Sequence, residues 1–217
     1  KYIYSNGDIY EGDWIKGEYN GKGKLSSSDG DEYIGLWANG KKEGQGILSD
    51  LNGQKYVGQW TKDLRSGDGS QTYLNGDRYE GEWLENKRDG FGIMTYANGN
   101  LYEGKWKKGL SNGIGTYTYA NGDIFSGKWE DGRKNGKGTI NYINGDQYDG
   151  DWSNNKIQGL GVFTYANGSS YDGEWLNGKR NGRGTFITAA NEKYLGEWLN
   201  NLKEGEGTYT YGDGSKY

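Results

Sequence analysis

The sequence predicts an all-β protein, an elongated single-layer antiparallel sheet of tandem β-hairpins that stays open and twists like a ribbon. Three observations predict this fold class. An aromatic residue recurs every 23 residues from Tyr10 to Tyr217. A Trp follows four positions after each of the first nine. Glycines occupy fixed positions around these rings, which leaves bare backbone beside them.

The composition requires a periodic architecture if the chain is to fold. The 217 residues include 42 Gly, 9 Trp and 20 Tyr, with no Pro, Cys or His, and only 31% are apolar. A conventional two-layer domain of this length needs more Leu, Ile and Val in its core. High glycine with low hydrophobicity favours disorder, but strict internal repetition indicates a repeat protein instead.

Positions within a repeat are counted from its recurring aromatic residue, which is position 0, so that +4 is the residue four places later. Glycine stands at +2, +11 and +13 in all nine repeats and at +20 in eight, with Asn191 as the exception. Asn is the residue that best tolerates a left-handed backbone after Gly. We expect a partial repeat at 1–9 and the start of a tenth at 217, hence a segment of a longer array. Full repeats start at 10, 33, 56, 79, 102, 125, 148, 171 and 194. The Trp residues at +4 are Trp14, Trp37, Trp60, Trp83, Trp106, Trp129, Trp152, Trp175 and Trp198.

Alternation within each repeat predicts two strands. The first places the aromatic residue, Gly and Trp on one face and charged residues on the other. Ala-Asn-Gly at 97–99, 120–122 and 166–168 suits a three-residue hairpin loop with a left-handed last residue. This loop places +15 opposite the aromatic residue of the next repeat, and glycine opposite glycine. The loop within a repeat, such as Asn39-Gly40, is expected to place +4 opposite +11. Strands about 4.8 Å apart would give a ribbon about 85 Å long.

The residues needed for common enzyme chemistry are missing. Without His or Cys, the usual zinc sites and Cys or His nucleophiles are excluded. A formal charge of −4 gives no indication of nucleic acid. Carboxylates recur on the face expected to be solvated, so we predict no enzyme, no metal and no cofactor. These carboxylates are Glu11, Asp13, Glu80, Glu82, Asp149, Asp151, Asp172 and Glu174.

Three surfaces are candidates for binding. The glycine row between the Tyr and Trp rows is expected to form a shallow groove for a partner helix or peptide. Its central residues are Tyr79, Trp83, Gly92, Tyr102, Trp106, Gly115, Phe125, Trp129 and Gly138.

Basic residues at +8 and +9 predict a loop edge that could bind anionic lipid or acidic protein. They include Lys41, Lys42, Lys87, Arg88, Arg133, Lys134, Lys179 and Arg180. Unpaired strands at the array ends could also support self-association.

The pattern YxGxW(x)6GxG resembles the MORN (membrane occupation and recognition nexus) repeat, over essentially the whole chain. Tyr2, Tyr4, Asn6 and Gly7 continue the pattern at the start of the chain. The resemblance implies a positioning role, as in repeat-only radial-spoke head proteins of the cilium or flagellum and protozoan cytoskeletal proteins. We therefore expect a non-catalytic scaffold that binds protein partners within a ciliary or cytoskeletal assembly.

The alternative is a phosphoinositide-targeting module of a larger enzyme that uses the basic loop edge. The first interpretation places the protein in the cytoplasm, at the cytoskeleton or cilium axoneme, and the alternative places it at the membrane periphery. The flanking sequence would discriminate between them, because a catalytic domain favours the alternative and more repeats favour the scaffold.

Overall fold

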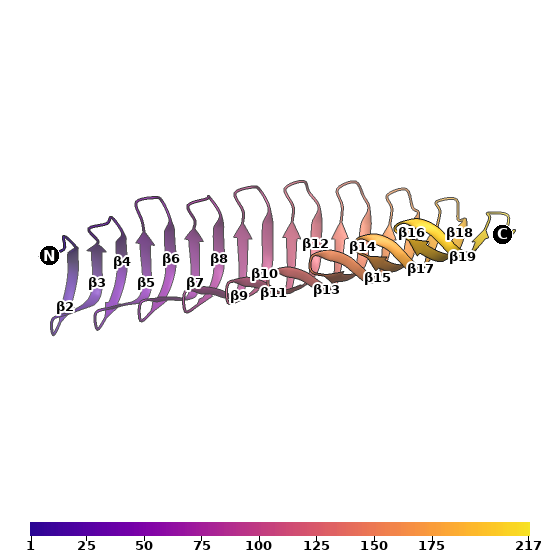
Figure 1. Cartoon of the computed structure of the whole chain (residues 1–217). Coiled ribbons are helices and arrows are strands. Elements are labelled where there is room, and N and C mark those ends of the chain that lie inside the picture. Colours follow the sequence, from indigo (N-terminus) through magenta and orange to yellow (C-terminus); the bar gives the residue numbers. More distant parts are fainter. The chain divides into compact units, whose positions relative to one another are not determined.

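The computed structural model describes all residues, 1–217, and contains nineteen β-strands and no helix. The all-β prediction is confirmed. No helix is therefore present that could cross a membrane. The chain forms two compact units, Lys1–Leu110 and Ser111–Tyr217. Within each unit, the hairpins follow one another in chain order (Figure 1).

The first unit is an open single-layer sheet in which each strand pairs antiparallel with the next along the chain. Its strands are β1 (Tyr2–Ile3), β2 (Ile9–Ile15), β3 (Glu18–Ser26), β4 (Glu32–Ala38), β5 (Lys41–Ser49), β6 (Lys55–Thr61), β7 (Leu64–Thr72), β8 (Arg78–Leu84), β9 (Lys87–Thr95) and β10 (Leu101–Lys107).

The second unit repeats this arrangement, again with sequential antiparallel pairing. Its strands are β11 (Leu110–Thr118), which begins one residue before the boundary, β12 (Ile124–Glu130), β13 (Arg133–Asn141), β14 (Gln147–Ser153), β15 (Lys156–Thr164), β16 (Ser170–Leu176), β17 (Lys179–Ile187), β18 (Lys193–Leu199) and β19 (Leu202–Thr210). The single-layer antiparallel prediction is confirmed within each unit.

Two kinds of loop join the strands. Within a repeat, a two-residue turn has positive φ at both positions, for example 49° at Asn39 and 74° at Gly40. Positive φ at both positions defines a type I′ turn, whose twist matches that of paired strands. Between repeats, the last loop residue is left-handed, with φ of 96° at Gly122. Asn191 takes this role with φ of 62°, as the sequence predicted.

The register between repeats is as predicted, and within a repeat Gly35 also lies opposite Gly46, but the predicted pairing beside the turn is absent. Leu25 lies opposite Tyr33, at +15 and position 0 of successive repeats. Within the hairpin of β4 and β5, Trp37 lies opposite Lys42 at +9 and not opposite Gly44 at +11. The prediction was wrong because β5 bulges where Gly44 adopts a φ of 63°. Gly44 instead lies opposite Trp60 of the next repeat.

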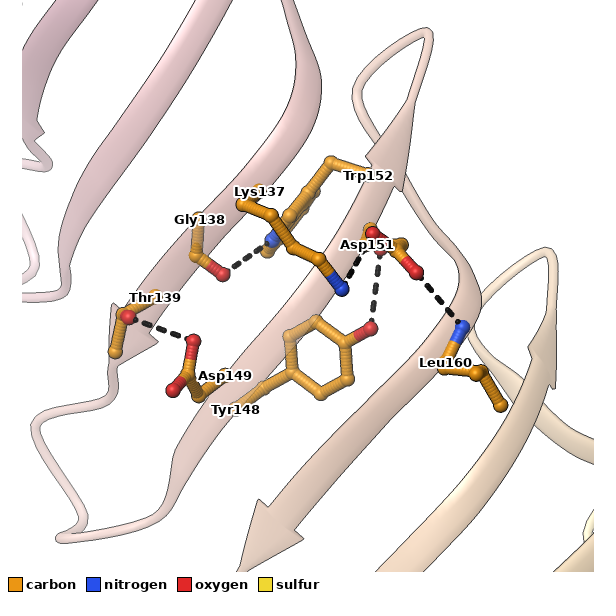
Figure 2. A network of polar contacts seen from close by, with 8 residues as sticks. All are labelled: Lys137, Gly138, Thr139, Tyr148, Asp149, Asp151, Trp152 and Leu160. Carbon is orange, nitrogen blue, oxygen red and sulfur yellow. Dashed lines mark hydrogen bonds and ion pairs between the residues drawn. The ribbon is translucent and has the colours of Figure 1, made fainter.

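The core is a row of aromatic rings on one face of each sheet, called here the aromatic face. The Tyr148 hydroxyl donates to the Asp151 carbonyl at 3.0 Å, so the ring lies along its own strand (Figure 2). Trp152 Nε1 donates to the Gly138 carbonyl of the preceding repeat at 2.9 Å. The two rings meet edge to face with centroids 5.7 Å apart, a favourable aromatic geometry. Each repeat is thus tied to the one before it through buried rings.

Candidate interaction face

A second layer of side chains covers the buried rings of the aromatic face. It comes from positions +9 and +17 of the repeats and is called here the outer layer. Position +9 holds Tyr19, Lys42, Arg65, Arg88, Ser111, Lys134, Ile157, Arg180 and Lys203. Position +17, counting Tyr4 in the partial repeat, holds Tyr4, Ser27, Asp50, Tyr73, Tyr96, Tyr119, Tyr142, Tyr165, Thr188 and Tyr211.

The cations of the outer layer stack on the rings below them. Lys134 is the most enclosed, with 6% of its surface exposed. Its Nζ lies 4.6 Å from the Phe125 ring centroid and 5.0 Å from that of Trp152, and it donates to the Tyr119 hydroxyl. Burial lowers the pKa of Lys134 to about 8, since desolvation disfavours the charged form. Aromatic faces thus replace a carboxylate as the partner of this cation.

The arginines of the outer layer also connect successive repeats. Arg88 lies 4.2 Å from the Trp106 ring centroid and donates to the Gly109 carbonyl at 2.6 Å. Arg180 lies 4.4 Å from the Trp198 ring centroid. Because a guanidinium presents several donors in one plane, it can stack on a ring and bond a loop carbonyl together. The outer layer therefore adds inter-repeat contacts above the core.

The groove predicted along the glycine row is filled by the tyrosine rings. A Cβ added to Gly92 would lie 2.5 Å from Tyr79 Cζ, so the ring lies directly on the glycine backbone. The sequence showed which residues share this face but not that the rings lie flat along it. All nine predicted groove residues are buried, namely Tyr79, Trp83, Gly92, Tyr102, Trp106, Gly115, Phe125, Trp129 and Gly138. A partner on this face meets the outer layer first, and partner binding at the face stays a prediction.

The predicted basic edge is divided between the two faces of the sheet. Strand β5 already begins at Lys41, so Lys41 and Lys42 alternate. Lys42 lies on the aromatic face, over Tyr33 and Trp60. The same division applies along the array. Exposed residues at +8 are Lys41, Lys87, Arg133 and Lys179, whereas Lys42, Arg88, Lys134 and Arg180 at +9 are partly or fully buried. The sequence analysis placed both positions in the loop within the repeat, which it took to be longer than it is. The Asn-Gly pair, which is typical of a two-residue turn, was the signal that +8 and +9 belong to the strand.

The opposite, charged face carries surface ion pairs. Lys137 Nζ lies 2.8 Å from Asp151, which also accepts a hydrogen bond from the Leu160 N–H at 3.0 Å (Figure 2). The Thr139 hydroxyl donates to Asp149 at 3.1 Å. No group of three or more Asp and Glu side chains is placed to hold a metal ion. These carboxylates have the partners expected of a solvated face.

The aromatic face of the first unit contains a hollow of about 520 Å³, called here the Asp50 hollow. Sequence reasoning did not locate it, although Gln71 was visible as the polar exception among the +15 residues. The signal that could have found it is the coincidence of Asp50 at a tyrosine position with Gln71 at an apolar one. The lining residues include Asp31, Lys42, Asp50, Lys55, Tyr56, Trp60, Asp63, Arg65, Gln71 and Tyr73.

These features define a tandem β-hairpin repeat protein with a layered aromatic face. The MORN repeat family matches nine consecutive stretches, and the chain belongs to this family. The matched residues are 10–32, 33–55, 56–78, 79–101, 102–124, 125–147, 148–170, 171–190 and 194–216. No match was found among curated protein sequences.

Solved structures of similar fold exist at low sequence identity. The TCP10 domain of Danio rerio CPAP is 12% identical, with a TM-score of 0.51 over 90% of this chain and 92% of that one. The Drosophila melanogaster SAS-4 (dCPAP) TCP domain, in complex with a proline-rich motif of Ana2, is 17% identical, with a TM-score of 0.46 over 82% of this chain and 90% of that one. At 12% identity, the likeness to the Danio rerio CPAP domain concerns the fold alone.

Proposed function

We propose that this chain is a non-catalytic scaffold that binds protein partners on the outer layer of its aromatic face. The observation that carries the proposal is the outer layer itself. Partly exposed cations and tyrosines lie in register above buried rings, and no further element within either unit covers them. Aromatic and arginine side chains are the types that contribute most to protein interfaces. A regular array of them suits a long partner segment.

The chemistry of the face favours binding over catalysis. The buried polar and charged side chains are Gln71, Ser111, Lys134 and Ser169. Only Lys134 among them has a titratable group, and its Nζ is enclosed by rings and the Tyr119 hydroxyl. A catalytic lysine must reach a substrate. The proposal therefore assigns the cations to stacking and partner contact.

We place this scaffold in a ciliary or other cytoskeletal assembly of the cytoplasm, with the axoneme as the expected location. The uninterrupted 23-residue period supports this placement, because it resembles the long repeat-only members of the MORN family. Such a scaffold would hold partners at fixed intervals along its repeats. Association with further copies through strand edges is part of the same proposal.

The test is capture of partners from a cell lysate by the wild-type chain and two variants. The first variant carries Tyr142→Ser and Tyr165→Ser in the outer layer. The matched control carries Asp149→Ser and Asp172→Ser on the charged face. We expect the first variant to lose partners at least about tenfold and the control to retain them. Near-ultraviolet circular dichroism of the Trp residues checks that all three chains fold.

The opposite result would contradict the proposal. Loss in the charged-face control alone would place the partner there. A third variant, Lys41→Ser with Lys179→Ser, tests the membrane alternative through the exposed +8 cations. Vesicles containing phosphoinositide that bind the wild type but not this variant would favour the alternative, with binding falling as salt is raised.

A further inference from the structure

The row of +17 tyrosines is interrupted in the first unit. Tyr4 and Tyr73 occupy this position on either side, but Ser27 and Asp50 stand between them. The Asp50 hollow lies on the same face at this interruption. Its volume, about 520 Å³, lies within the range of pockets that bind ligands.

The chain itself shows what fills this position elsewhere. The Tyr119 hydroxyl accepts a hydrogen bond from Lys134 Nζ, and its ring centroid lies 4.8 Å from that nitrogen. The Tyr4 hydroxyl lies 2.5 Å from the Tyr19 hydroxyl. In both cases a +17 tyrosine covers the +9 side chain of the following repeat. A tyrosine ring with its hydroxyl toward +9 is therefore the occupant that this architecture accommodates.

Neither residue at the interruption replaces the missing ring. Ser27 occupies the position that would cover Lys42, and its hydroxyl donates to Asp29 in the loop. Asp50 is held by its own loop, where it accepts hydrogen bonds from the Asn52 and Gln54 N–H groups at 2.9 Å each. The hollow therefore exists because the Ser27 and Asp50 side chains are short and are held by hydrogen bonds within their own loops.

Lys42 is a polar group in the hollow whose ammonium a ligand could meet. Its Nζ lies 5.1 Å from the Tyr33 ring centroid and 5.0 Å from that of Trp60. Burial lowers the pKa of Lys42, while Asp63 and Asp31 act in the opposite direction. By contrast, Arg65 is engaged by Gln71 Oε1 at 2.8 Å and by the Asn86 carbonyl at 3.3 Å. A hydrogen-bond acceptor brought by a ligand would therefore be directed to Lys42.

The charges around the hollow favour a neutral ligand group over an anion. Its acidic residues are Asp31, Asp50 and Asp63, and its basic residues are Lys42, Lys55 and Arg65. These formal charges balance, so a carboxylate or phosphate would gain little net attraction. A phenol offers an apolar ring for Tyr56 and Trp60 and a neutral hydroxyl for Lys42.

We propose that the Asp50 hollow binds a tyrosine side chain presented by an extended peptide segment of a protein partner. The hollow reaches from Lys42, the +9 residue after Ser27, to Arg65, the +9 residue after Asp50. The ring takes the place of the tyrosine that is missing before Lys42, and its hydroxyl accepts a hydrogen bond from Lys42. This inference rests on the proposed function, because it puts the partner on the same aromatic face. It adds a specific residue type and a specific repeat to that function.

The test begins with a random peptide library selected on the full chain. Recovered peptides are expected to share a tyrosine. Their affinity is then measured by fluorescence anisotropy for the wild type and for Asp50→Tyr, which fills the hollow from within. We expect Asp50→Tyr to weaken binding at least about tenfold, and replacement of the peptide tyrosine by Phe to weaken it about fivefold.

Two further variants separate the ligand contact from effects on folding. Asp50→Asn removes the charge without adding a ring and should retain binding. Lys42→Met should weaken the tyrosine peptide about fivefold but leave the Phe peptide unchanged, because only the former has a hydroxyl to lose. Lys137→Met, at an exposed lysine of the charged face, is the control and should bind both peptides as the wild type does.

Several results would overturn the inference. Peptides that are acidic and lack tyrosine would assign the hollow to an anion. Equal binding by the wild type and Asp50→Tyr would place the peptide elsewhere, as would an equal effect of Lys42→Met on the Tyr and Phe peptides. If partners from the lysate are lost with Tyr142→Ser and Tyr165→Ser but not with Asp50→Tyr, this inference fails while the proposed function stands.

Discussion

The surroundings of Asp50 in the first unit and of Tyr119 in the second show two forms of one repeat. Around Tyr119, the outer layer is closed, since the tyrosine hydroxyl meets Lys134 above the Phe125 ring. Around Asp50 the equivalent layer is open, and Lys42 lies over its rings beside a hollow. The same architecture therefore supports both a sealed surface and a recessed one.

The loops between repeats differ in the same way. In the second unit, the Asp123 carboxylate accepts a hydrogen bond from the Ile143 N–H of the next loop at 2.9 Å. The corresponding residue after Asp50 is Gln54, whose side chain instead bonds back to Asp50 at 2.7 Å. Beside the hollow, a hydrogen bond within one loop therefore replaces the hydrogen bond that joins successive loops elsewhere.

Beneath these differences the buried layer is the same. The Tyr56 hydroxyl donates to the Gln59 carbonyl at 3.0 Å, as the Tyr148 hydroxyl does to Asp151. The rings and glycines hold the hairpins together in both units. The outer layer therefore varies between repeats without changing the fold.

The prediction with the largest expected effect asks whether the buried layer of rings and glycines is equally well packed in the first and the second unit. A Cβ at Gly69 or Gly161 would lie 2.6 Å from the Cε2 atom of Tyr56 or Tyr148. We expect Gly69→Ala and Gly161→Ala each to lower the free energy of unfolding by about 3 kcal/mol, since the ring has nowhere to move. Urea denaturation followed by Trp fluorescence measures both.

The control for this pair is Gly178→Ala. Gly178 has a φ of 78° but no atom near its added Cβ. Only backbone strain opposes this change, at about 1 kcal/mol. A much milder effect at Gly69 than at Gly161 would show that the open region has a looser core.

The second prediction concerns the Trp hydrogen bonds. Trp152 Nε1 lies 2.9 Å from the Gly138 carbonyl, whereas Trp60 Nε1 lies 3.4 Å from that of Gly46. Trp152→Phe is expected to cost about 2 kcal/mol and Trp60→Phe about 1 kcal/mol, because the longer bond contributes less. Thermal unfolding of the two variants measures the difference. Equal losses would mean that ring area, and not the hydrogen bond, sets the cost.

The third prediction is a pH dependence caused by Lys134. Its pKa falls from 10.5 to about 8 on folding. Between these values the unfolded chain holds a proton that the folded chain has released, so stability rises with pH across this window. We expect a gain on the order of 1 kcal/mol between about pH 8 and 9.5. Lys134→Met should remove this rise, which urea denaturation at several pH values would detect.

The upper limit of that window comes from the buried tyrosines. Burial raises the pKa of Tyr56 to about 12. Above pH 10 the unfolded tyrosine ionises first, so stability falls again as pH rises. A wild-type profile that falls steadily from pH 8 would contradict a lowered Lys134 pKa in the folded chain.

The smallest expected effect concerns the loops. Asp123→Ala removes the bond to the Ile143 N–H and should cost about 1 kcal/mol. Gln54→Asp should restore the acidic loop residue in the open region and raise stability by about 0.5 kcal/mol. Differential scanning calorimetry compares their unfolding temperatures. A loss with Gln54→Asp would show that the Gln54–Asp50 bond is needed there.

The candidate site was predictable as a face but not as a set of contacts. Strand alternation placed Tyr79, Trp83 and Gly92 on one face, and the structure agrees. It could not show that Tyr79 covers Gly92, because that depends on how the ring rotates onto its neighbours. It also missed Lys42 and Lys134 on this face, because a longer turn was counted before them.

The sequence by itself determined the repeat, the strands and the register between repeats. The period from Tyr10 to Tyr217, the loop glycines and Asn191 are local signals that act through backbone conformation and strand alternation. Only the tertiary structure decided the bulge at Gly44, the filled glycine row and the hollow beside Lys42. These features depend on how side chains of successive repeats pack above the sheet, and packing is settled between residues that are distant in sequence.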